Sequence, residues 1–86
     1  MALQRLQSVV VDTNSSFVYL GTLADVNEHF VMLKEVDAHD KTDSTATKER
    51  YIMDCARFGV KANRREVAVR KELVVSLSKL SDVISY

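Results

Sequence analysis

The sequence predicts a mainly β fold: a small, strongly bent five-stranded antiparallel sheet, or partly open barrel, with a short N-terminal helix and a helix inserted between the third and fourth strands. Three observations predict it. Up to Val36, three apolar or β-branched runs follow one another across short polar turns, which is typical of an antiparallel meander. Gly21 interrupts the second run, and a glycine inside a strand commonly marks a sharp bend. One amphipathic stretch of helical period then precedes two further short strands.

The N-terminal part is expected to hold a helical turn and three strands. Leu3 and Leu6 are three apart among good helix formers, whereas the run SVVVDT that follows is β-branched. The Asn and Ser side chains after it favour a turn because they bond their own backbone. The predicted elements are a helix over residues 2–7 and strands over 8–13, 17–26 and 30–36, joined by turns at 14–16 and 27–29.

The C-terminal part is expected to hold the inserted helix and the last two strands. Residues 37–43 are polar and read as irregular chain. Tyr51, Cys55 and Phe58 recur at helical spacing over about 44–58, where Asp43 or Ser44 can cap the start and Gly59 the end. Val67 and Val69 share one side of a strand over 66–70. A last strand over 73–80 places Leu73, Val75 and Leu77 on one face and Val74 on the other, before an apolar tail at about 81–86.

Length and composition predict a single domain spanning residues 1–86. Apolar residues make up 47% of the chain, which is too high for a disordered protein. Cys55 is the only cysteine, so an internal disulfide is excluded. The sequence has neither a secretory signal nor an apolar run long enough to span a bilayer, so we expect a cytoplasmic protein without a membrane partner.

The charges balance overall but not along the chain. Lys plus Arg equals Asp plus Glu at 12 each, so no bulk attraction to nucleic acid is indicated. Residues 25–43 carry six acids and two bases, whereas residues 57–72 carry six bases and two acids. If the two segments lie on different faces, one face can attract phosphate; two solvated surfaces of opposite sign remain the alternative.

Two stretches resemble the motifs of the Sm and Sm-like (LSm) proteins. Residues 21–33, GTLADVNEHFVML, are similar to the first motif, which has a glycine in a bent strand, alternating apolar residues and a turn before the third strand. Residues 67–75, VAVRKELVV, are similar to the second motif, in which an apolar-Arg-Gly-Asp/Asn turn joins the last two strands. The order and spacing of the strands match over about residues 3–36 and 66–80.

The resemblance implies an open Sm-like barrel that forms closed rings of about five to seven copies. It also implies single-stranded RNA in pockets around the pore. His29 matches the position that stacks on a base, and Arg70 matches the motif arginine. Val31 stands where the family has a base-reading Asn, and valine has no donor or acceptor, so hydrogen-bonded recognition of uridine should be lost there. Lys71 replaces the glycine that follows the arginine, and Glu72 stands at the Asp/Asn position.

Each candidate also has a structural explanation. His29 can stack on a base, or simply lie in solvent or on a neighbour. Arg70 can stack on a base, or pair with Glu66 or Glu72 across a subunit contact. The weaker candidates for phosphate contacts, which can equally be a solvated run, are Lys61, Arg64 and Arg65. The apolar residues Phe17, Tyr19, Phe30 and Met32 are core or subunit contacts, with an aromatic platform for bases as the alternative.

No catalytic, cofactor or metal site is expected. The sequence has no Gly-rich phosphate loop, nucleophile elbow or paired-Cys motif. Asp37, His39 and Asp40 are close in sequence, but neither a strand nor a loop would direct all three at one centre. Cys55 lies on the apolar stripe of the helix and is expected to be a small buried residue.

Two functions follow. The first is a homo-oligomeric ring whose pore-facing patch of His29, Arg70 and Lys71 binds single-stranded RNA with little base preference. The second is a ring that serves as a protein-interaction scaffold without RNA binding, with a partner at the inserted helix or the tail. A monomeric β domain with an accidental resemblance is a third, weaker hypothesis.

Overall fold

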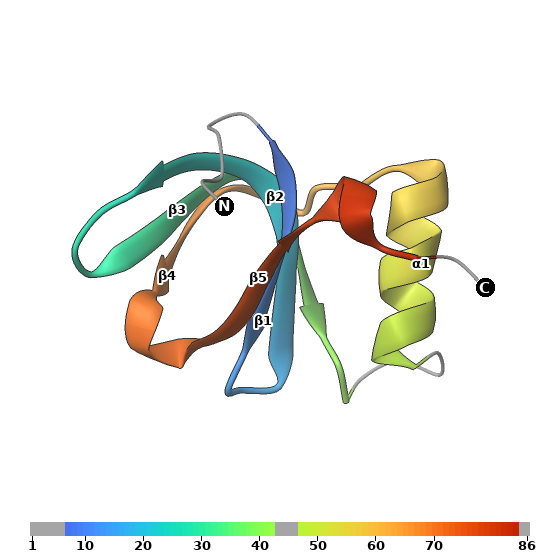
Figure 1. Cartoon of the computed structure of the whole chain (residues 1–86), viewed down its shortest axis with the longest axis horizontal. Coiled ribbons are helices and arrows are strands. Elements are labelled where there is room, and N and C mark those ends of the chain that lie inside the picture. Colours follow the sequence, from blue (N-terminus) through green and yellow to red (C-terminus); the bar gives the residue numbers. More distant parts are fainter. Residues whose placement is uncertain (1–6, 43–46, 85–86) are drawn as a thin grey trace.

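A computed structural model describes residues 7–42 and 47–84 of the chain, which form a mainly β fold with one α-helix (Figure 1). The five strands make one antiparallel sheet in the order β4-β3-β2-β1-β5. The elements in chain order are β1 (Ser8–Thr13), β2 (Phe17–Val26), β3 (Phe30–Asp40), α1 (Lys48–Phe58), β4 (Arg64–Arg70), the 3₁₀ turn η1 (Lys71–Leu73), β5 (Val74–Lys79) and the 3₁₀ turn η2 (Leu80–Asp82). The prediction of five strands with a helix between the third and fourth is confirmed.

The sheet has an open edge at β4 and another at β5, which are joined at one corner by η1. It is not strongly curled, which corrects the prediction of a strongly bent sheet. Local irregularities in the described part include two register shifts between β2 and β3, one between β1 and β5, and a positive φ of 50° at Glu35. One shift flanks Gly21, where an added Cβ would lie 3.0 Å from the carbonyl oxygen of Lys34. Glycine fits this position because the backbones of β2 and β3 approach each other closely there.

The predicted N-terminal helix, at residues 2–7, lies outside the described residues except for Gln7. The carbonyl of Gln7 accepts a hydrogen bond from the Leu23 N–H at 2.7 Å, so the chain already runs beside β2 before β1 begins. No helix precedes β1 in the part of the chain that the structure describes.

The third strand is longer than predicted, since residues 37–40 continue β3 instead of forming irregular chain. Phe17 pairs with Asp40 and Val18 with His39, so the start of β2 supplies the partner that these polar residues lack locally. Their polarity misled the prediction because the strand that pairs with them, β2, lies far away in the sequence. Asp37 accepts hydrogen bonds from Tyr51 and Asn63, whereas Asp40 accepts from the nearby Thr42, and the buried Nε2 of His39 has no hydrogen-bond partner among the described residues.

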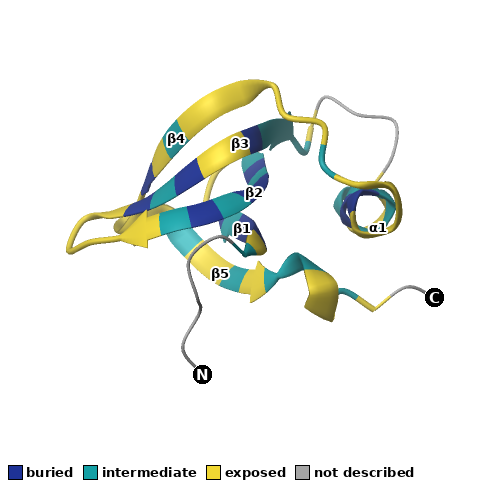
Figure 2. Cartoon of the chain, turned by 90° about the horizontal axis from the view of Figure 1, so that it is seen from above, coloured by how far each residue is buried: buried dark blue, intermediate teal, exposed yellow. Residues whose placement is uncertain are grey.

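The two faces of the sheet bury two separate apolar clusters, because successive side chains of a strand point to opposite faces. Figure 2 shows buried positions alternating with partly buried or exposed ones along much of β2 and β3. The first cluster, which we call the inner core, contains Val9, Val11, Leu23, Val31, Leu33, Val36 and Val69. The second, the helix-side core, contains Val10, Val18, Leu20, Ile52 and Cys55.

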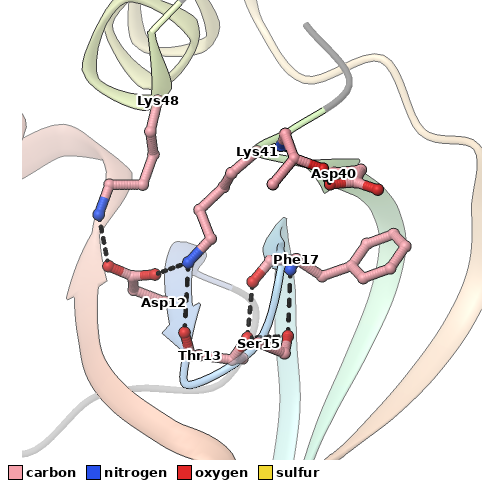
Figure 3. A network of polar contacts seen from close by, with 8 residues as sticks. Asp12, Thr13, Ser15, Phe17, Asp40, Lys41 and Lys48 are labelled. Atoms are coloured by element: carbon pink, nitrogen blue, oxygen red, sulfur yellow. Dashed lines mark hydrogen bonds and ion pairs between the residues drawn. The ribbon is translucent and has the colours of Figure 1, made fainter.

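Helix α1 covers the helix-side core and is anchored by polar contacts at its start. Thr47 caps it by accepting a hydrogen bond from the Arg50 N–H at 3.2 Å, instead of the predicted Asp43 or Ser44. Gly59 ends it with φ 94° and donates to the Cys55 carbonyl at 2.9 Å, as predicted. Lys48, the first helical residue, reaches Asp12 on β1 (Figure 3).

The last strand is shifted by a bulge. β5 pairs with β1 through Asp12–Ser76 and Thr13–Val74, which leaves Val75 as the extra residue. Val74 and Leu77 therefore pack on the inner core together, while Val75 is exposed, and this corrects the predicted grouping of Leu73, Val75 and Leu77. Beyond β5, Leu80 and Val83 pack on the helix-side core, so the predicted tail is partly built into the fold.

Candidate nucleic-acid interface

The turn between β2 and β3 is held by the side chain of Asn27. Its Oδ1 accepts hydrogen bonds from the backbone N–H groups of His29 at 3.0 Å and Phe30 at 2.9 Å. The Asn27 N–H donates to the Phe30 carbonyl at 3.0 Å. These bonds stand in for a backbone turn and leave the His29 side chain 76% exposed.

The end of β4 lies directly beside this turn. Phe30 pairs with Arg70 in the sheet, and the Lys71 N–H donates to the His29 carbonyl at 2.9 Å. Residues that are about forty positions apart in the sequence therefore meet. The structure brings together the three residues of the principal predicted patch, His29, Arg70 and Lys71.

These residues surround a surface hollow of about 460 Å³. Its lining consists of Glu28, His29, Phe30, Arg70, Lys71 and Glu72. Phe30, predicted as a core or subunit contact with an aromatic platform for bases as the alternative, lines the hollow, and Glu28 joins it without having been predicted. Their adjacency to His29 in a tight turn was the signal that could have found them.

The charges in the hollow are mixed. Arg70 Nε lies 2.7 Å from Glu72 Oε1, and His29 Nε2 lies 3.9 Å from Glu28 Oε2. The Arg70–Glu72 pair had been expected across a subunit contact, but it forms within one chain. Both of its side chains are about two-thirds exposed, so the pair contributes at most ~1 kcal/mol and Arg70 can exchange it for another anion.

Val31, at the position where the resembling family has Asn, belongs to the inner core. It is 4% exposed and pairs with Val69 across β3 and β4. An apolar side chain that faces the core cannot contact a ligand in the hollow. Any base held between His29 and Arg70 would be held without a hydrogen bond from this position.

Lys61, Arg64 and Arg65 do not join this patch. Arg64 begins β4 and Arg70 ends it, so the two are separated by the length of the strand, on the order of 20 Å. Lys61 instead lies beside Phe58 and Gly59 at the end of α1, where the three line a second hollow. The basic residues of the 57–72 segment therefore lie in two separate regions.

A second polar cluster fixes α1 to β3. The Tyr51 hydroxyl donates to Asp37, and the Tyr51 and His39 rings stack with centroids 3.7 Å apart. Asn63 donates to Asp37 Oδ1 and to the Ala38 carbonyl, both at 3.1 Å. Burial and the hydrogen bond to Asp37 raise the pKa of Tyr51 well above its ordinary value. The cluster therefore holds a neutral tyrosine that orients the helix.

The thiol of Cys55 is buried and has a structural role. Cys55 is 7% exposed in the helix-side core, as predicted, and burial raises the pKa of its thiol, which disfavours the nucleophilic thiolate. Within residues 7–42 and 47–84, no three His, Cys, Asp or Glu side chains gather in a way that could hold a metal ion. None of the described helices is long and apolar enough to cross a membrane.

Comparison with known proteins gives no relative. The chain matches no protein-family model, no curated protein and no solved structure. The geometry of the hollow and the motif resemblance are therefore the observations that bear on function.

Proposed function

We propose that the chain is an Sm-like protein that assembles into a closed ring and binds single-stranded RNA with little base preference at the His29, Arg70 and Lys71 patch. The observation that carries the proposal is the hydrogen bond from Lys71 to His29, which gathers the three candidate residues around one hollow. An imidazole and a guanidinium that are both exposed provide two planar surfaces between which a base can stack.

The ring part of the proposal is supported by the two free edges of the sheet. Among the strands that the structure describes, β4 and β5 each have a neighbour on one side only, so their outer backbone groups are available to pair. Pairing β4 of one copy with β5 of the next is a head-to-tail contact, and such contacts close into rings when the rotation allows. An Sm-like arrangement of the five strands is the finer form of the fold that this proposal adopts.

The first test is the mass in solution, measured by light scattering. A mass of about five to seven times the 9.7 kDa chain supports the ring. A monomer at micromolar concentration would remove this part of the proposal.

The second test is fluorescence anisotropy with labelled oligouridylate and oligoadenylate at about 0.15 M salt. Both should bind, within about threefold of each other, because no polar group at Val31 reads the base edge. Arg70→Ala should weaken both by about tenfold through loss of stacking. Glu66→Gln, on the same strand but outside the hollow, is the control. An affinity unchanged in Arg70→Ala would contradict the assignment.

The alternative function, a scaffold that forms a ring but binds no RNA, is favoured by one observation. The glutamates of the hollow already pair with Arg70 and approach His29. Under this alternative neither oligonucleotide binds, and a protein partner is retained by the chain but lost when α1 is removed.

A further inference from the structure

Phe58, the last residue of α1, is the most exposed of the described large apolar side chains. It is 79% exposed, whereas other members of the helical stripe, Ile52 and Cys55, are buried. Beside it lies a second hollow of about 250 Å³. The hollow is lined by Asp37, Tyr51, Asp54, Cys55, Phe58, Gly59 and Lys61. The aromatic ring of Phe58 therefore contributes little to the core and forms part of an exposed surface.

One basic side chain contacts the Phe58 ring, and two more lie on the segment that follows it. The Arg57 guanidinium lies 5.8 Å from the ring centroid, in the range of a cation–π contact. Lys61 lines the same hollow. Arg64 follows Asn63, whose side chain donates to Asp37 of the same hollow, and Arg64 Nη1 donates to the Asn63 carbonyl at 3.0 Å. Arg65 is left out, since alternation along β4 directs it to the opposite face.

The carboxylates at this corner already have hydrogen-bond or ion-pair partners, whereas the cations have no carboxylate partner among the described residues. Asp54 lies 3.4 Å from Arg50, and Asp37 accepts from Tyr51 and Asn63. Among residues 7–42 and 47–84, no carboxylate forms an ion pair with Arg57, Lys61 or Arg64.

We propose that this corner, which we call the α1 corner and define by Arg57, Phe58, Lys61 and Arg64, is a second contact site for single-stranded nucleic acid. A base stacks on Phe58, and the adjoining phosphates contact the three cations. An exposed aromatic ring among unpaired cations is the combination that holds a single strand without reading its sequence. The inference rests on the proposed function for its class of ligand but not for its place, because the strand β4 separates the corner from the His29 hollow.

The test uses Phe58→Trp as a local reporter, since the chain contains no tryptophan. Titration with an oligouridylate of about 12 nucleotides should quench the fluorescence of this tryptophan as a base stacks on it. Lys61→Ala and Arg64→Ala in the Phe58→Trp background should weaken the quenching titration. Lys34→Ala, an exposed lysine on β3, should not.

The matched control for stacking is Phe58→Leu, which keeps apolar bulk at an exposed position. Anisotropy with the same oligonucleotide should show that Phe58→Leu and Phe58→Ala both weaken binding by about fivefold or more, because each removes the π face. If Phe58→Leu binds as tightly as the unaltered chain, stacking at this corner is excluded.

The two sites are separated by combining the reporter with His29→Ala and Arg70→Ala. If the oligonucleotide still quenches the reporter when His29→Ala and Arg70→Ala are also present, the result supports a contact site at the α1 corner that is independent of the His29 patch. Anisotropy that responds to Arg70→Ala while Trp at 58 stays unquenched leaves the proposed function standing and overturns this inference. A lower mass in solution for Phe58→Ala, with unchanged RNA affinity, also overturns the inference. The Phe58 side chain would then be a contact between copies of the chain.

Discussion

The carboxylate of Asp12 is bonded to two lysines that flank the connection into α1. Its Oδ2 lies 2.8 Å from Lys48 Nζ and its Oδ1 lies 3.2 Å from Lys41 Nζ (Figure 3). Lys41 also donates from Nζ to the Thr13 carbonyl at 3.3 Å. One acid on β1 thereby fixes both the end of β3 and the first residue of the helix.

Replacing Asp12 should loosen the helix. Asp12→Asn removes the anion but leaves two lysines that are 23% and 32% exposed, so the free energy of unfolding should fall by about 1–3 kcal/mol. Urea denaturation measures this change. The control is Glu72→Gln, which breaks a far more exposed pair and should cost less than about 1 kcal/mol. Equal losses in the two variants would contradict a structural role specific to Asp12.

The same carboxylate should make stability depend on pH. Burial acts to raise the pKa of Asp12, but hydrogen bonds and charges from Lys48 and Lys41 outweigh it, and the pKa falls below its ordinary value of 3.8. A lowered carboxyl pKa contributes stability that is complete above the ordinary value and is lost as pH falls through the folded value. The difference in urea midpoint between the unaltered chain and Asp12→Asn should therefore be constant near neutrality and shrink below about pH 4. A constant difference down to pH 2 would contradict this.

Gly21 should tolerate no side chain. A Cβ there would lie 3.0 Å from both the Lys34 carbonyl oxygen and Val36 Cγ2, so Gly21→Ala should destabilise the fold by about 1–3 kcal/mol. Gly59→Ala is the comparison, because a Cβ there meets nothing within 4 Å and its cost comes from the backbone alone, at φ 94° and ψ 165°. Thermal unfolding measures both variants, and a Gly21→Ala variant as stable as the unaltered chain would contradict the close approach of β2 and β3.

Cys55 should report on the seating of α1. Because its thiol is 7% exposed and burial raises its pKa, a thiol reagent should label it slowly at neutral pH. Tyr51→Phe removes the hydroxyl that holds the helix to Asp37, so labelling should become faster under native conditions. A labelling rate that is the same in Tyr51→Phe would mean that this hydrogen bond does not limit local opening.

RNA binding at the His29 patch should depend only weakly on salt. Arg70 and Lys71 can together neutralise one or two phosphates, which gives a slope of log affinity against log salt between about −0.7 and −1.4. Anisotropy between low and moderate salt measures the slope. If the α1 corner also contributes, the slope should become less steep in Lys61→Ala. If log affinity still falls steeply with log salt in a variant that lacks both Lys61 and Lys71, the RNA contacts cations elsewhere on the chain.

Local sequence patterns determined much of the fold. Ser8–Thr13 and Phe17–Val26 form the predicted strands, because β-branched runs and an Asn-Ser-Ser turn bias the backbone without help from distant residues. The proximity of His29 and Arg70 followed only from a resemblance, since no local rule connects residues so far apart.

Tertiary structure alone decided the features that depend on distant partners. Residues 37–40 are strand because β2 pairs with them, Val75 is exposed because of a bulge against β1, and Asp12 lies near Lys48 because α1 packs on that face. The tertiary structure also places Arg64 and Arg70 at opposite ends of β4, although both belong to the basic segment 57–72 of the sequence. A pattern along the chain sets which face a side chain occupies, but the register across the sheet sets which other residue it meets.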